Sequence, residues 1–136
     1  MAAVKELIRT ENDGTISFGD YELSEKQKLE DFENNGNLYK VKTYSELTKL
    51  ERDGLFVYES EPGTAVTGFK AKKDGVEFTV SGKDDAQITV GLMEDTEYNV
   101  SVNGREIGKM KTNLGGKLSF SVELSGEYGV FVKVTL

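Results

Sequence analysis

The sequence predicts a mostly β protein: an immunoglobulin-like or related antiparallel β-sandwich, preceded by a smaller strand-rich segment with one short helix. Two observations predict the sandwich. Short segments of alternating polarity follow one another from Val76 to Leu136, and turns that contain glycine separate them. We expect the smaller segment to span residues 1–62 and the sandwich 63–136. The two should pack as one unit, because about 60 residues of polar β-structure are marginal alone.

The alternation has a period of two, which is the side-chain period of a strand. In one segment Val76, Phe78 and Val80 alternate with polar residues, so these three side chains are predicted on one buried face. Two further segments share the pattern: Tyr98, Val100 and Val102, and then Leu118, Phe120, Val122 and Leu124. Each strand is therefore expected to turn one face to a core.

Two glycine dipeptides predict hairpin registers. Asn103-Gly104 suits a type I′ turn, because both central residues need a positive φ, and it places Val100 opposite Ile107. A turn at Asp74-Gly75 places opposite charges on one face and apolar residues on the other. The pairs it predicts are Lys72 with Glu77, Phe69 with Val80 and Ala71 with Phe78.

The first strands of the chain are predicted at residues 4–10 and 15–23, joined as a hairpin at 11–14. Residues 24–27 have the spacing of a capping box, so residues 24–31 are expected to form a short helical turn or a loop. Both interpretations stay open, because this stretch is almost wholly polar.

A second hairpin is predicted at Asn35-Gly36 by the same turn chemistry. A two-residue turn at this position sets Phe32 opposite Tyr39 and Asp31 opposite Lys40. Apolar and charged pairs then lie on separate faces of the hairpin.

Residues 44–52 carry a different period. Tyr44, Leu47 and Leu50 recur at three-residue intervals, which predicts a short amphipathic helix. A capping box at Thr43 and Glu46 and a terminal Gly54 agree with it. The alternative is a hairpin with its turn at Asp53-Gly54, which sets Leu50 opposite Val57.

Residues 55–59 (Leu-Phe-Val-Tyr-Glu) form an apolar run without alternation, which predicts a central strand covered on both sides. Pro62 follows and cannot occupy a central strand, since it lacks an amide proton. We therefore place the junction of the two parts near residues 61–65.

The last predicted strand runs from Tyr128 to Leu136 and ends the chain. Val130, Val132 and Val134 share one face, and Phe131 and Lys133 lie on the other. A terminal strand often lies at the edge of a sheet, where its free amides and carbonyls can pair with another chain. These five residues are the predicted self-association site, which makes the protein itself the expected partner.

Composition narrows the possible functions. The 136 residues carry a net charge of −7, and the 17 basic residues are scattered, which argues against nucleic acid as a partner. Histidine and cysteine are absent, so no catalytic residue, metal ligand or cofactor is predicted. No run is long and apolar enough for a membrane helix, and the N-terminus has no leader pattern, so a cytoplasmic location is expected.

Acidic and aromatic residues leave a weaker alternative. The acid pairs Asp84-Asp85, Glu94-Asp95 and Glu59/Glu61 lie in or beside predicted turns, where solvated carboxylates are the ordinary case. A glycan could stack on tyrosine, and Tyr44 and Tyr128 are the candidates outside predicted strand interiors.

Several segments resemble a family of short clostridial proteins of unknown role. They are spread over residues 36–118, which is most of the chain: 36–43 (Gly-Asn-Leu-Tyr-Lys-Val-Lys-Thr), 49–51 (Lys-Leu-Glu), 56–60 (Phe-Val-Tyr-Glu-Ser), 62–66 (Pro-Gly-Thr-Ala-Val) and 111–118 (Lys-Thr-Asn-Leu-Gly-Gly-Lys-Leu). Some members of this family are labelled endosialidases.

Sialidases resemble one another in a six-bladed propeller of several hundred residues, in which three arginines hold the substrate carboxylate. This chain has three arginines, Arg9, Arg52 and Arg105, and residues 10–14 are similar to an Asp box, but its length is too short for the propeller. We interpret Arg52 and Arg105 as solvated residues beside turns. The resemblance therefore implies a family and no activity.

The sequence predicts a non-enzymatic structural or self-assembling protein, because reactive groups are missing and a terminal strand suits edge pairing. The alternative is a module that binds a glycan or a protein through loops at one end of the sandwich.

Overall fold

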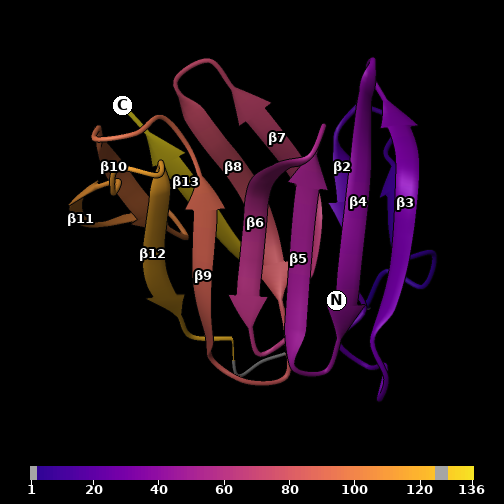
Figure 1. Cartoon of the computed structure of the whole chain (residues 1–136). Helices are drawn as coiled ribbons and strands as arrows, with labels where there is room; N and C mark the ends of the chain where they lie inside the picture. The colour runs from indigo at the N-terminus through magenta and orange to yellow at the C-terminus, as the bar shows by residue number, and fades with distance from the viewer. Residues whose placement is uncertain (1–2, 125–128) are drawn as a thin grey trace.

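The computed structural model describes residues 3–124 and 129–136 and confirms the β-sandwich (Figure 1). All regular elements in that part of the chain are strands, and their pairings are antiparallel. No helix occurs there, so none could span a membrane. The predicted helix at residues 44–52 is therefore wrong.

Two sheets pack face to face. The seven-stranded sheet has the order β1-β2-β7-β8-β13-β10-β11, and the six-stranded sheet has the order β12-β9-β6-β5-β4-β3. The strands of the first are β1 (Ile8–Thr10), β2 (Ile16–Phe18), β7 (Ala65–Lys72), β8 (Gly75–Ser81), β13 (Val130–Thr135), β10 (Glu97–Val102) and β11 (Arg105–Lys111). Those of the second are β12 (Lys117–Val122), β9 (Ala86–Gly91), β6 (Leu55–Glu61), β5 (Leu47–Arg52), β4 (Asn37–Tyr44) and β3 (Gln27–Asn34).

Both sheets take strands from both halves of the chain. β1 and β2 belong to the seven-stranded sheet, whereas β9 and β12 belong to the six-stranded one. The chain passes between the sheets several times, and the crossing after β6 contains a cis bond between Glu61 and Pro62.

The core lies between the sheets, as the alternation predicts. Val76, Phe78 and Val80 are all buried on β8. An aromatic cluster of Phe18, Tyr58, Phe69 and Phe78 connects the two sheets, with ring centroids 5.3–5.8 Å apart. Such ring pairs stabilise a core by about 0.5–1.5 kcal/mol each beyond their buried area.

The residues of the predicted helix form a hairpin instead. Thr48 and Leu50 are buried while their neighbours are half exposed, which is the period of a strand. Asp53 and Gly54 have φ values of 51° and 80°, as a type I′ turn requires, so the alternative hairpin is confirmed. A bulge after Leu50 sets this residue opposite Tyr58 and not Val57.

The helical turn or loop predicted at residues 24–31 is wrong from Gln27 onward, because β3 begins at that residue. The Asn35-Gly36 turn and the pairing of Phe32 with Tyr39 are confirmed. Asp31 does not lie opposite Lys40, since it occupies a bulge with φ 58°.

The first hairpin is confirmed in a shorter form. β1 and β2 have three residues each, and Leu7 with φ 73° precedes β1. β6 lies within its sheet as predicted, between β5 and β9. It is not covered on both sides, because Leu55 at its start is 71% exposed.

Two further registers differ from the prediction, one because of a bulge and the other because its turn lies one residue earlier than predicted. Val100 lies opposite Gly108, and Ile107 is exposed. In the other hairpin Lys72 lies opposite Gly75, so the turn residues are Lys73 and Asp74. The pairs observed there are Ala71 with Val76, Lys70 with Glu77 and Val66 with Val80.

The prediction that the last strand lies at a sheet edge is wrong. β13 pairs with β8 on one side and with β10 on the other. Val132 and Val134 are fully buried, and residues 130–135 pair with β8 while residues 132–135 also pair with β10. The predicted self-association site is therefore not available for pairing with another chain.

Candidate functional site

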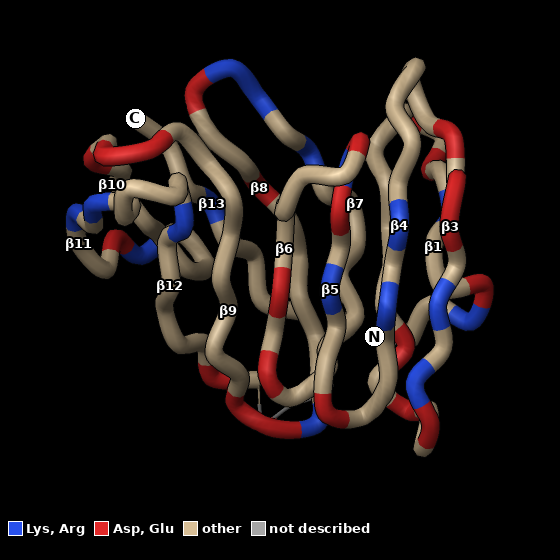
Figure 2. The backbone as a smooth tube through the Cα atoms, viewed as in Figure 1, with Lys and Arg blue, Asp and Glu red and all other residues tan. Residues whose placement is uncertain are grey.

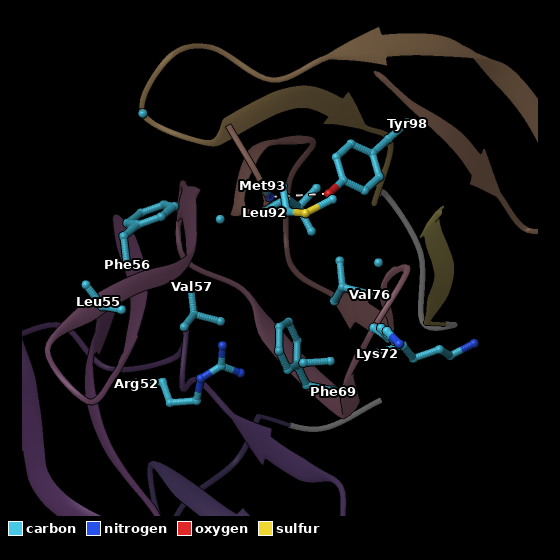
Figure 3. A pocket seen from close by; sticks show the side chains of 15 residues that line it. Arg52, Leu55, Phe56, Val57, Phe69, Lys72, Val76, Leu92, Met93 and Tyr98 are labelled. Atoms are coloured by element: carbon cyan, nitrogen blue, oxygen red, sulfur yellow. Dashed lines mark hydrogen bonds between the residues drawn. The ribbon is translucent and has the colours of Figure 1, made fainter. Parts of the chain in front are cut away.

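A cavity opens at one end of the sandwich, between the β5–β6 turn, the β7–β8 turn and the segment after β9 (Figure 3). Its volume is about 550 Å³, within the range of about 300–1,000 Å³ that is typical of small-molecule sites. Both sheets contribute to it, because β5 and β6 belong to one and β7 and β8 to the other. The cavity therefore exists only in the assembled sandwich.

The walls of the cavity are mixed, with apolar side chains at the inner surface and at part of the mouth. Val57, Phe69 and Val76 are buried and form its inner surface, whereas Leu55 and Met93 at the mouth are 71% and 53% exposed. Exposed apolar side chains around a cavity are what a ligand with an apolar body would remove from water.

The mouth of the cavity is held in place by hydrogen bonds. Met93 N donates to the Tyr98 hydroxyl at 3.2 Å, shown as the dashed line in Figure 3. The Thr112 hydroxyl donates to Met93 O at 2.6 Å. The segment between β9 and β10 is thus fixed to β10 and to the residue that follows β11, so this wall is formed before any ligand binds.

Arg52 is the charged group inside this apolar surface. It ends β5 and lies two residues after Leu50, so it shares the face of β5 that is directed at the other sheet. In Figure 3 its side chain lies between Val57 and Phe69. The residue is half buried, and its guanidinium forms no ion pair or hydrogen bond with any of the described residues.

The cavity is cationic although the chain is acidic. Arg52, Lys72 and Lys73 line it, and no carboxylate does. Lys72 Nζ pairs with Glu77 Oε1 at 2.6 Å, outside the lining. Figure 2 shows basic residues at the end of the β7–β8 hairpin, with one acidic residue, Asp74, beside them in the turn. A cleft with one sign of charge attracts the opposite sign even when the whole protein has a net charge of −7.

A second, smaller cavity of about 280 Å³ adjoins the first. The two share Arg52, Phe69 and Ala71. The smaller cavity is polar: Asn34 and Asn35 line it, and their amide groups donate to Gly14 O at 3.3 and 3.4 Å. Arg52 therefore lies between an apolar compartment and a polar one.

The tyrosines proposed for glycan stacking do not contribute to this end. Tyr44 lies at the β4–β5 turn, at the opposite end of β5 from Arg52. Its hydroxyl donates to Glu46 at 3.4 Å, and Lys26 Nζ lies 5.5 Å from its ring centroid. Tyr128 lies outside the described residues.

The three arginines do not converge. Arg9 is on β1 and Arg105 is on β11, which are the opposite edges of the seven-stranded sheet, and Arg52 is in the other sheet. Arg9 already pairs with Glu6 at 3.5 Å and with Glu11 at 3.0 Å. The arrangement that a sialidase needs is therefore not present among these residues.

The acid pairs do not form a joint site either. Asp85 accepts a hydrogen bond from Leu124 N at 3.0 Å, and Asp95 pairs with Lys111 at 3.1 Å. Glu59 and Glu61 border a small hollow of about 130 Å³ on the six-stranded sheet. Among the described residues, no group of three or more acids could hold a metal ion.

Sequence reasoning missed the cavity and assigned Arg52 to solvent. The signal that could have found it is parity: an arginine two positions after a buried leucine on a strand has the same orientation as that leucine. The short helix predicted there hid this relation.

Comparison of the chain with family models, with curated proteins and with solved structures finds no match. The resemblance to short clostridial proteins therefore stays a prediction, and the function is argued from the site.

Proposed function

We propose that the protein is a non-catalytic binding module whose ligand occupies the cavity at the β5–β6 and β7–β8 end of the sandwich. The observation that carries this proposal is Arg52, a half-buried residue in the lining of the cavity whose guanidinium has no ion pair or hydrogen bond with any described residue. Holding an arginine partly out of water without a partner is unfavourable for folding. A binding site is a reason for a chain to keep such a group.

The chemistry of the lining supports binding over catalysis. The sequence has no histidine or cysteine, and the lining residues include three cations without a carboxylate. The lining residues do not include a carboxylate or imidazole that could act as the general base of a hydrolysis reaction. The proposal continues the expectation of a module that binds through loops at one end of a sandwich.

A fragment screen monitored by amide NMR shifts tests the proposal. We expect the bound fragments to shift residues of this cavity, such as Leu55 and Met93. Ala71→Trp should weaken their binding at least tenfold, because Ala71 is exposed and borders both cavities, so that the indole fills space without disturbing the core. Lys133→Trp, on the exposed face of β13, is the matched control. Hits spread over the surface, or unchanged by Ala71→Trp, would contradict the proposal.

Self-association is a second candidate function, and one observation favours it at β12. Among the described strands β12 pairs with β9 alone, through a six-residue register without a shift. The other edges are blunted: β1 has three residues, and β3 and β11 contain bulges beside Asp31 and Gly108. Regular edge strands that are neither short nor bulged are the ones that pair with other chains.

Light scattering over a concentration series tests this second candidate. Wild-type protein should gain mass as its concentration rises, and Ser121→Lys on the exposed face of β12 should raise the dissociation constant at least tenfold. Gln87→Lys is the control, because Gln87 lies directly opposite Ser121 but one strand away from the edge. A wild-type protein that stays monomeric at all concentrations rules out association through this strand.

A further inference from the structure

We infer that the ligand is a small organic anion with an apolar body, bound by a carboxylate that pairs with Arg52. This inference rests on the proposed binding function and names the ligand class. It depends on three features of the cavity: Arg52 has no partner among the described residues, the charged residues of the lining are basic, and part of the wall is apolar.

The first feature is the missing partner of Arg52. A guanidinium keeps its charge at every physiological pH and presents several donors in one plane, a geometry that matches a carboxylate. No described residue supplies that carboxylate. Closing the cavity with a neutral ligand would remove water from Arg52 without replacing its hydrogen bonds, whereas an anion would form a charge-assisted pair.

The second feature is the sign of the charges. The cavity lining contains Arg52, Lys72 and Lys73 and no acidic residue, and Lys72 is already paired with Glu77, so Arg52 and Lys73 are its cations without an ion pair among the described residues. Lys117 Nζ also lies close by, 4.5 Å from the ring centroid of Phe56, which itself lines the cavity. Cations of a ligand would be repelled here, and anions would be attracted from a distance.

The third feature is the apolar wall. Leu55 and Met93 are exposed at the mouth, and Phe69 and Val76 are buried behind them, with Arg52 to one side. A ligand that reaches Arg52 from the mouth therefore passes over apolar side chains. Burial of its apolar part contributes about 25 cal/mol per Å². An alkyl or aryl carboxylate satisfies all three features.

Three ligands with the same ten-carbon chain test the inference: decanoate and decyltrimethylammonium, each below its micellar concentration, and decan-1-ol below its solubility limit. Binding is measured by calorimetry and by the amide NMR shifts of cavity residues. We expect decanoate to bind at least tenfold more tightly than decanol and the ammonium to bind least. Raising the salt concentration should weaken the binding of decanoate more than that of decanol.

Variants of Arg52 test whether this residue causes the preference for decanoate over decanol. Arg52→Gln should weaken decanoate binding at least tenfold and leave decanol binding unchanged, and Arg52→Lys should recover part of the loss, because it keeps the charge without the planar fork. Arg105→Gln, on the exposed start of β11, is the control and should change neither affinity. Thermal unfolding should show Arg52→Gln to be at least as stable as the wild type, which separates a binding role from a structural one.

The outcomes distinguish the inference from the function it rests on. If decanol and decanoate bind the cavity equally, and Ala71→Trp weakens both, the binding module stands and the anionic ligand class is wrong. The same conclusion follows if Arg52→Gln leaves decanoate binding intact. If none of the three ligands shifts the cavity residues and the fragment screen also finds no hit there, the binding function itself is wrong.

Discussion

Gly75→Ala is expected to lower the free energy of unfolding by about 3 kcal/mol or more, the largest effect of a single methyl group that we predict for this fold. A Cβ on residue 75 would lie 1.8 Å from Val134 O and 2.8 Å from Val134 C. The obstacle is backbone of the neighbouring strand, so no side chain can rotate away. The φ of Gly75, 153°, is also one that residues with a side chain rarely adopt.

The position of Gly75 makes local relief difficult. It begins β8 and lies opposite Lys72 of β7 and Thr135 of β13, so it is held by strands on both sides. Leu136 N also donates to Asp74 O at 2.9 Å. Relieving the overlap would separate β13 from β8 at this end, beside the cavity wall that Gly75 and Val76 form.

Urea denaturation of Gly75→Ala and Gly104→Ala measures the effect. Gly104 also has a positive φ, 81°, but an added Cβ there would meet no atom within 4 Å. We expect its substitution to cost about 1 kcal/mol, the conformational part alone. Equal losses for the two variants would show that the close approach of Val134 does not decide the stability.

Thr64→Val is expected to lower the free energy of unfolding by about 2–3 kcal/mol, because it removes the partner of two buried hydroxyl groups. The Thr64 hydroxyl lies 2.8 Å from the Tyr58 hydroxyl and 2.8 Å from the Ser60 hydroxyl. All three residues are fully buried. Burial holds the pKa of Tyr58 far above its usual range, so its hydroxyl stays protonated and able to donate.

This network ties the crossover between the sheets to the six-stranded sheet. Thr64 N donates to the Thr48 hydroxyl at 3.0 Å, and that hydroxyl donates to Thr64 O at 2.8 Å. Thr43 Oγ1 lies 2.8 Å from Thr48 Oγ1 and accepts from Asp20 N at 2.9 Å. Hydroxyl groups of β4, β5 and β6 thus form hydrogen bonds with Asp20 and with Thr64, the residue before β7.

A double-mutant cycle measures the coupling in this network. Tyr58→Phe alone should cost about 1 kcal/mol, and the double variant Tyr58→Phe/Thr64→Val should cost about 1 kcal/mol less than the sum of the single variants. Thr89→Val is the control: its hydroxyl lies 2.8 Å from that of Ser119, but this pair is exposed, so the change should stay within about 0.5 kcal/mol. Strict additivity of Tyr58→Phe and Thr64→Val would contradict the network.

Local patterns predicted the strands well where the alternation is regular. The buried sets on β8, β10 and β12 follow from the sequence, because the orientation of side chains along one strand is a local property. Registers were harder to predict. The bulges beside Leu50, Val100 and Thr67 each add a residue to one strand of a hairpin, and no dipeptide of the turn shows them.

The candidate site could not be predicted from local sequence patterns. Tyr44 was selected for lying outside predicted strands, whereas Arg52 was assigned to solvent beside a turn. Its role appears only when β5 and β7 face each other, because the apolar wall at Phe69 and Ala71 comes from the other sheet. The cavity lining extends from Arg52 to Gly115 in the sequence, and hydrophobic alternation carries no information about neighbours so far apart along the chain.

From the chain alone follow its β class, the turns at Asn35-Gly36 and Asn103-Gly104 and the faces that its regular strands bury, since these depend on the two-residue period and on which residues tolerate positive φ. The order of the strands does not follow, since backbone pairing is nearly independent of side-chain identity, and β13 could have closed an edge as well as the middle of a sheet. Packing of the two sheets places β13 between β8 and β10 and directs Arg52 into an apolar cavity. That arrangement depends on residues far apart in the sequence. It places the candidate site in the cavity at one end of the sandwich, whereas the sequence had placed it on the last strand of the chain.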